Sequence, residues 1–248
     1  MCTDPIMAHA PEGPDAPEEI VEIAFRIAGG RLPTDHAWAL RSAVVERLPW
    51  MENEPAAGIH PIHGAASGNG WERPDDASGQ WLLLSHRTSL KLRIPARRAP
   101  EAKALCGHRL DLDMTRLDIG EARVRPLAAS PTLFARHLLD EDSDATEAKG
   151  DDDEGGNESG DEERFIARWR SSIEALTHRS PRTICGLRNR IKTPTGALPT
   201  RSLLIADLDI KASIAIRRHG FEEDTLLGCG LFIPHKSIDP IANSTASR

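Results

Sequence analysis

Histidine is the side chain in this sequence best suited to moving protons, because its pKa lies near neutrality. His36 follows Thr34 and Asp35, at the expected start of a helix over residues 36–48. A helix N-terminus favours the neutral imidazole, which can act as a general base. The pattern therefore indicates an acid–base catalyst at His36, with a capping or surface histidine as the alternative.

Three further histidines are candidates for the complementary acid or base: His60 and His63 in the segment HPIH, and His235 near the C-terminus. His60 is the second catalytic candidate, because a short strand over 58–62 would end near the start of the first helix. Each of the three could instead be a loop or strand-end histidine that bonds only to the backbone. The H-x-x-H spacing lacks further zinc ligands, so we expect no metal site and no cofactor.

Cationic side chains recur at alternate positions, which places them on one face of an extended strand. A row of such cations can follow a nucleic-acid backbone, with an affinity that falls steeply as salt is added. Taken singly, each could equally be a solvated surface charge. Together with backbone and C-terminal candidates, the residues expected to bind RNA are Lys91, Arg93, Arg97, Arg98, Arg188, Arg190, Lys192, Arg217, Arg218, Gly228, Gly230, His235 and Lys236.

A histidine base beside a cationic surface is typical of RNA cleavage without a metal ion. The base removes the proton of the 2′-hydroxyl, cations stabilise the scissile phosphate, and an acid protonates the departing 5′-oxygen. The residue types of this sequence could supply the base, the acid and the cations of such a reaction.

The glycine-rich stretch from Gly220 to Lys236 could add backbone donors to this chemistry. Gly220 suits the left-handed position that closes a helix. Gly228 and Gly230 permit a close backbone approach, and their amides could hold a phosphate. The alternative is a helix cap followed by a bulged strand.

The net charge of −7 over 248 residues would by itself argue against a nucleic-acid partner, but it is unevenly distributed. Residues 140–163 hold 13 acidic residues and one lysine, and residues 1–19 hold five acidic residues and no base. The remainder carries 20 acidic and 30 basic residues. The expected folded part is therefore basic, as RNA binding requires.

No apolar run approaches the roughly 18 residues of a membrane helix. The first 19 residues are acidic and proline-rich, unlike a secretory signal. The four cysteines are scattered without a CxxC pair, which favours reduced thiols. We expect a cytoplasmic protein with no membrane partner.

The order of expected elements indicates an α+β protein with two tandem ferredoxin-like (βαββαβ) units and a C-terminal glycine-rich loop. The first unit would comprise a strand from Ile20, the helix 36–48, a strand at 58–62, a hairpin of 81–84 with 90–94, a helix at 96–106 and an extended segment at 110–127. The second would comprise a strand at 131–139, a helix at 164–176, a hairpin of 184–191 with 202–208, a helix at 210–218 and a strand at 226–234.

The corresponding domain boundaries are a disordered leader at 1–19, an N-terminal domain at 20–129 and a C-terminal domain at 130–237. The acidic run 140–163 is expected to be a disordered insertion in the second domain, because it has too little apolar content to order itself. Residues 238–248 would form a flexible tail.

Four segments together resemble the CRISPR repeat-RNA endoribonuclease family (Cas-six), in particular its myxococcal-type subgroup: 31–40 (RLPTDHAWAL), 58–62 (GIHPI), 89–95 (SLKLRIP) and 227–236 (LGCGLFIPHK). The resemblance implies two ferredoxin-like domains and cleavage within the CRISPR repeat to release guide RNAs. It implies a 2′,3′-cyclic phosphate or equivalent product and a catalytic histidine at the position of His36. It also implies a bound role in a CRISPR effector complex of the Cascade type, beside other subunits.

The sequence departs from this family at Glu222, Glu223 and Asp224, where relatives usually carry arginine or lysine. Carboxylates repel phosphates, so phosphate binding by this loop is in doubt. Two other functions stay open: a non-catalytic subunit that binds the guide-RNA hairpin, and a ferredoxin-like protein-interaction module. The acidic run could be a surface insertion without a role, or it could compete with RNA for the basic face.

Overall fold

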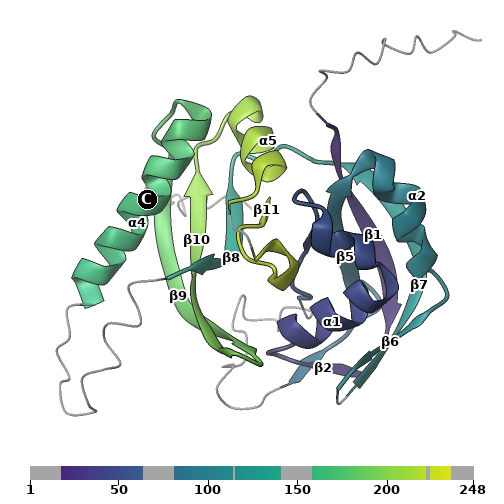
Figure 1. Ribbon diagram of the computed structural model, residues 1–248. Helices are drawn as coiled ribbons and strands as arrows, with labels where there is room; N and C mark the ends of the chain where they lie inside the picture. Colours follow the sequence, from purple (N-terminus) through teal and green to yellow (C-terminus); the bar gives the residue numbers. More distant parts are fainter. Residues whose placement is uncertain (1–17, 64–80, 114, 141–157, 222–223, 236–248) are drawn as a thin grey trace, which may run out of the picture.

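The computed structural model describes residues 18–63, 81–113, 115–140, 158–221 and 224–235, which form a mixed α/β fold with antiparallel sheets (Figure 1). The first half contains β1 (Ile20–Ala28), β2 (Arg31–Pro33), α1 (Ala37–Arg47), η1 (Pro49–Asn53), β3 (Gly58–Ile59), β4 (Trp81–Leu83), β5 (Ser89–Pro95), η3 (Ala96–Arg98), α2 (Ala99–Ala102), η4 (Lys103–Leu105), β6 (Arg109–Leu112) and β7 (Thr115–Pro126). The second half contains β8 (Leu133–Leu139), α4 (Glu158–Thr177), β9 (Arg182–Thr193), β10 (Gly196–Ala206), α5 (Ile210–His219), η6 (Thr225–Leu227) and β11 (Phe232–Pro234).

The first sheet has the order β3-β5-β1-β7-β6 and buries one face against helices. Alternation along β1 directs Ile23, Phe25 and Ile27 into this core, while Glu22 lies on the opposite face. Leu40 of α1 and other apolar residues of the helical turns over 96–105 complete the same cluster. The expected first strand and first helix are therefore present, with the helix beginning directly after His36.

The second sheet has the order β11-β8-β10-β9, and α4 and α5 cover one of its faces (Figure 1). Phe165, Trp169 and Ile173 lie at helical spacing on α4 and pack against the strands, with Ile216 of α5 in the same cluster. This second apolar cluster is separate from the first, so each half buries its own core.

The expected hairpin between 81–84 and 90–94 is wrong. β4 pairs instead with β2 in a separate two-stranded sheet, with Leu82 opposite Leu32. β5 is already paired with β1 on one edge and with β3 on the other, so it has no free edge for β4. Which strand β4 pairs with depends on the strands that already occupy both edges of β5. The residues next to β4 in the sequence do not determine this.

Three further boundaries differ from the expectations. α4 begins at Glu158, so residues 158–163 of the acidic run are helical and not part of a disordered insertion. β9 and β10 extend from 182 to 206, so most of the expected turn TPTGALPT is strand. The last strand covers only Phe232–Pro234, because Thr225–Leu227 form a turn of 3-10 helix.

Several expectations fall on residues that lie outside the described part of the chain. They are the leader over 1–17, the centre of the acidic run at 141–157, the acidic pair Glu222 and Glu223, Lys236, and the tail at 238–248. Among the helices of the described segments, none is long and apolar enough to cross a membrane.

Candidate functional site

His36 lies at the N-terminal end of α1 and is almost completely buried, with 3% of its surface exposed. Its Nε2 atom accepts a hydrogen bond from the backbone N–H of Ile62 at 3.0 Å. Since a backbone N–H can only donate, the ring proton must sit on Nδ1, which donates to the carbonyls of Pro33 (2.9 Å) and Thr34 (3.0 Å). The surrounding backbone therefore fixes His36 as one neutral tautomer.

This geometry sets a condition on catalysis by His36. The lone pair on Nε2 that would take a proton from a substrate is occupied by the Ile62 N–H. The segment that follows β3 must therefore release this bond before His36 can act on RNA. In the present arrangement His36 joins the start of α1 to that segment, 26 residues away along the chain.

His60 is also buried, with 5% of its surface exposed, and it faces a carboxylate. Its Nε2 atom lies 3.8 Å from Oε1 of Glu22, and its backbone N–H donates to the carbonyl of Lys91 at 3.0 Å. Burial lowers the pKa of His60 to about 4, although the Glu22 carboxylate acts in the opposite direction. His60 is therefore neutral at pH 7, which suits a base better than an acid.

Glu22 is one of two charged residues in the mostly apolar strand β1, and the sequence analysis did not single it out. Burial alone would raise the pKa of its carboxyl, but neighbouring positive groups lower that pKa overall. The Lys91 ammonium lies 3.8 Å from Oε1, and the Arg217 guanidinium donates to Oε2 at 2.5 Å. The sequence signal that could have identified Glu22 is its carboxylate on a half-buried strand, where an unpaired charge is costly.

The glycine-rich stretch packs tightly against the segment that carries His60. Gly228 has a left-handed backbone (φ 86°), and a Cβ there would lie 2.7 Å from the ring of Pro61. Thr225 donates its hydroxyl to the carbonyl of Ala57 at 2.7 Å. The glycine at 228 is therefore required for contact between the two halves of the protein.

The amides of this stretch are engaged within the protein. The N–H of Gly228 donates to the carbonyl of Thr225 at 3.1 Å, and the N–H of Gly230 donates to the carbonyl of His137 at 2.9 Å. Holding a phosphate with these two groups would require breaking both bonds. His137, a buried residue that the sequence analysis missed, also bonds through Nδ1 to the hydroxyl of Thr200 at 2.9 Å.

Arg93 and Arg217 are buried at 3% exposure each, although the sequence suggested that both bind RNA. Arg93 donates to the carbonyls of Ala56 (2.8 Å), Arg217 (3.0 Å) and Arg218. Arg217 donates to the carbonyl of Ala128 at 2.6 Å as well as to Glu22. Burial and the charge of Arg217 lower the pKa of Arg93 to about 10, so the Arg93 guanidinium stays charged at neutral pH. The donors of both arginines are used in contacts between the two halves.

Three of the remaining cationic candidates form ion pairs with carboxylates. Arg97 donates to Glu54 at 2.8 Å and also pairs with Glu18. Arg98 lies 3.5 Å from the same Glu54 oxygen and 2.8 Å from Glu101. Arg188 pairs with Asp161 at 3.2 Å and with Asp140 at 3.7 Å. Phosphate binding by these arginines would compete with carboxylates already in place.

Arg190, Lys192 and Arg218 have exposed side chains. The backbone N–H of Lys192 donates to the Asp35 carboxylate at 3.3 Å, which fixes the end of β9 beside the start of α1. Ile191 packs in a shared cluster with Ala37 and Trp38 of α1. The cationic strand β9 thus lies next to the start of α1. His235 lies at the far end of β8, against Phe134.

In the described segments, no group of three or more histidine, cysteine, aspartate or glutamate side chains is arranged to hold a metal ion. The imidazole groups described above are suited to proton transfer, and the arginine and lysine side chains are suited to charge stabilisation.

Comparison with known proteins adds an independent line of observation. The family model described as "Cas6 Crispr" matches residues 21–237. A curated relative, "CRISPR-associated endonuclease Cas6" of Myxococcus xanthus (strain DK1622), is 26% identical over 215 residues, which cover 86% of this chain and 81% of the relative.

Two solved structures share the fold. The first, "CRISPR associated protein Cas6", has a TM-score of 0.54 at 12% identity and covers 88% of this chain and all of its own. The second, from "Characterization of a Cas6-related gene from Pyrococcus furiosus", has a TM-score of 0.53 at 12% identity, with 86% and 98% covered.

Proposed function

The chain belongs to the Cas6 family, and from this premise we propose that it is an endoribonuclease that cuts CRISPR repeat RNA. The observation that carries the proposal is the hydrogen bond between the Lys192 amide and the Asp35 carboxylate. This bond holds the cationic end of β9 beside the residue that precedes His36, so a phosphate bound by the Lys192 side chain would approach the start of α1. The printed name of the Myxococcus relative, a CRISPR-associated endonuclease, supports the same activity.

We assign the two halves to tandem ferredoxin-like domains over 20–129 and 130–237. Numbered along the chain, the strands of the second sheet lie in the order fourth, first, third, second. In the first sheet, β7, β1, β5 and β3 follow the same order, with β6 added at the edge. A shared strand order with two crossover helices is what two copies of one βαββαβ unit would produce.

In the proposed reaction, His36 is the base. The 2′-hydroxyl of the RNA donates to Nε2 in the place that the Ile62 N–H holds in this structure. The deprotonated oxygen attacks the adjacent phosphorus and the bond to the 5′-oxygen breaks, without a metal ion. The departing 5′-oxygen takes up one proton, so the products are a 2′,3′-cyclic phosphate and a 5′-hydroxyl. His60 is the second candidate. Burial lowers its pKa to about 4, so the ring is neutral near pH 7 and would act as a weak proton acceptor.

The proposed RNA-contacting cations are those with exposed side chains near α1 and β9, in particular Arg190 and Lys192. Lys91 is 44% exposed and adds a further candidate on the first sheet. We further propose that the protein acts in the cytoplasm and stays on the cleaved hairpin as a subunit of a CRISPR effector complex.

A second candidate function is a non-catalytic subunit that binds the guide-RNA hairpin. The observation that favours it is the engagement of both ring nitrogens of His36 by backbone groups. The two functions share the fold and the cationic strand, so they differ only in whether the bound RNA is cut.

Incubation with the repeat RNA of the same genome in excess EDTA separates the two functions. The enzyme should cut the repeat at one position, leave a cyclic phosphate end, and fail on RNA with a 2′-deoxy nucleotide at that position. Tight binding with the RNA left intact would instead support the non-catalytic subunit. A scrambled hairpin of equal length is the control for sequence-independent degradation.

A further inference from the structure

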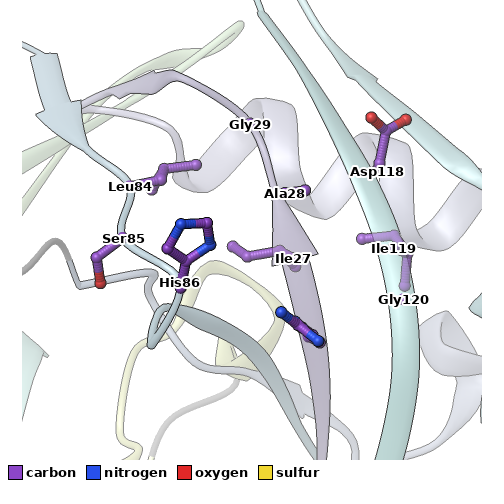
Figure 2. Close-up of a pocket in the computed structure, with 10 residues that line it drawn as sticks. Ile27, Ala28, Gly29, Leu84, Ser85, His86, Asp118, Ile119 and Gly120 are labelled. Carbon is purple, nitrogen blue, oxygen red and sulfur yellow. The ribbon is translucent and has the colours of Figure 1, made fainter.

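A cavity of about 560 Å³ lies at the end of β1, away from the α1–β9 site. It exists because β1 and β7 do not pair evenly: Phe25 lies opposite Ala122, whereas Ile27 lies opposite Ile119. β7 therefore contributes one extra residue, and the sheet is locally distorted as in a β-bulge. The segment that follows β4 forms the opposite wall of this bulge pocket (Figure 2).

The lining of the bulge pocket combines apolar walls with a polar rim. Leu84 is the largest partly exposed apolar residue of the lining, since Ile27 and Ile119 are only 4% and 2% exposed and pack in the core. Arg26, His86 and Asp118 are the charged or titratable residues. Figure 2 shows the His86 ring turned from its loop toward Ile27 of β1. Such a mixture suits a flat ring with apolar faces and polar edges better than a purely aliphatic ligand.

We propose that the bulge pocket receives the base of one unpaired nucleotide of the bound RNA, an inference that rests on the proposed function. A pocket of this volume is large enough for a nucleotide and too small for a helix or folded domain. The exposed cations Arg26 and Arg87 stand at and beside the rim, where the nucleotide's phosphate would lie. Single-stranded RNA is recognised in this way, with a splayed base held by its faces and edges.

The position of the bulge pocket suits RNA that extends beyond the cleavage site. From the pocket, the chain passes through Gly29 and Gly30 into β2 and reaches His36 at the start of α1. The hydroxyl of Thr115 on β7 donates to the carbonyl of Arg31 on β2 at 2.8 Å, which attaches this connection to the sheet. The pocket and α1 therefore belong to the first half, whereas β9 belongs to the second. An RNA strand that occupies both sites would cross from one half to the other.

The rim also indicates which bases fit. Asp118 accepts a 2.6 Å hydrogen bond from Arg109, and a carboxylate can accept a further bond from an exocyclic amino group. Arg26 and His86 offer donors to ring nitrogens or carbonyls of the same base. Adenine, cytosine and guanine present an amino group beside an acceptor, whereas uracil does not, so the pocket favours the first three.

The test combines a filled pocket with RNA that lacks single bases. Ala28 lines the bulge pocket with an exposed side chain, so Ala28→Trp would fill it without disturbing the core. Ile210→Trp, at a residue that is 73% exposed on α5, is the control for adding a surface indole. Repeat RNAs with one abasic nucleotide at each unpaired position are bound to each protein, and the dissociation constants are compared.

With the unmodified protein and with Ile210→Trp, one abasic position should weaken binding roughly tenfold. With Ala28→Trp, the intact RNA should bind roughly tenfold more weakly, and the same abasic position should have no further effect. His86→Ala, which leaves the strands untouched, should reproduce part of this loss. The inference would be overturned if the effects of Ala28→Trp and of every abasic position on binding were additive. The proposed function would be overturned if the unmodified protein did not cleave the repeat RNA.

Discussion

The Nε atom of Arg93 on β5 donates to the carbonyl oxygen of Arg217 on α5 over 3.0 Å, joining residues 124 positions apart. The same guanidinium also donates to the carbonyl of Ala56 in the first half. One buried side chain therefore satisfies backbone groups of both halves, including the end of a helix whose last carbonyls lack intrahelical partners. Such contacts hold the two halves together in the protein without RNA.

Replacing Arg93 with leucine should destabilise the fold by about 3 kcal/mol, because it leaves buried carbonyl groups without donors. Urea denaturation followed by tryptophan fluorescence would measure the change. Arg116→Leu is the matched control, since the Arg116 side chain is 72% exposed and pairs only with Asp111. Equal denaturation midpoints for the two variants would show that the Arg93 contacts do not stabilise the protein.

The burial of Arg93 also shows where prediction from sequence ends. Alternation in 89–95 correctly predicted a strand, and it placed Lys91 and Arg93 on one face. It could not show that α5 packs over one of these two residues and leaves the other 44% exposed. That difference depends on contact between segments more than 100 residues apart.

Local signals succeeded where short-range chemistry decides the structure. The helix expected from residue 36 is present and begins at Ala37, although its N-cap is His36 without a side-chain capping bond and not Thr34 or Asp35. Gly220 correctly marked the end of α5. The position of His36 relative to Ile62 was not predictable, because the hydrogen bond depends on how the segment after β3 returns to α1. The catalytic roles of the site residues therefore remain predictions, whereas the structure shows the contacts that surround them.

Gly228→Ala should cost about 2–4 kcal/mol, combining left-handed backbone strain with a clash against Pro61. Gly107→Ala provides a matched control, because Gly107 has nearly the same φ (81°) but nothing within 4 Å of a new Cβ. The difference in unfolding free energy between the two variants isolates the close packing of the glycine-rich stretch. If Gly107→Ala were equally destabilising, backbone strain alone would account for both changes.

His36→Ala should have two separable effects. Loss of the acceptor for the buried Ile62 N–H should lower the free energy of unfolding by about 1–3 kcal/mol. If His36 is also the base, cleavage of repeat RNA should be abolished at temperatures where the variant is fully folded and still binds. His36→Asn offers an alternative hydrogen-bonding side chain but no base near neutrality, so restored stability without cleavage would identify the base. Near-normal cleavage by either variant would remove His36 from the mechanism.

The stability of the protein should fall as the pH is lowered from about 6.5 toward 4. The pKa of His60 is about 4 in the folded protein and near 6.5 when unfolded, so between these values only the unfolded chain binds the proton. The contribution of His60 to the free energy of unfolding is fully present above pH 6.5 and is at most about 3 kcal/mol. His60→Gln should flatten this dependence, while His108→Gln, at an exposed histidine, should preserve it. An unchanged slope in His60→Gln would assign the pH dependence to other groups.

Arg190 and Lys192 should contribute to RNA affinity through phosphate contacts. Replacing either with alanine should weaken binding of repeat and unrelated RNA by similar factors, because phosphate contacts carry no sequence information. Each change should also reduce the slope of log affinity against log salt by about 1. Arg116→Ala is the control, as an exposed arginine on β7 in the first half. Binding titrations at roughly 50 to 300 mM salt, the range in which counterion release is measured, would test both the affinity and the slope. Variants of Arg190 and Lys192 that keep both the affinity and the slope of the unmodified protein would place the RNA on another surface.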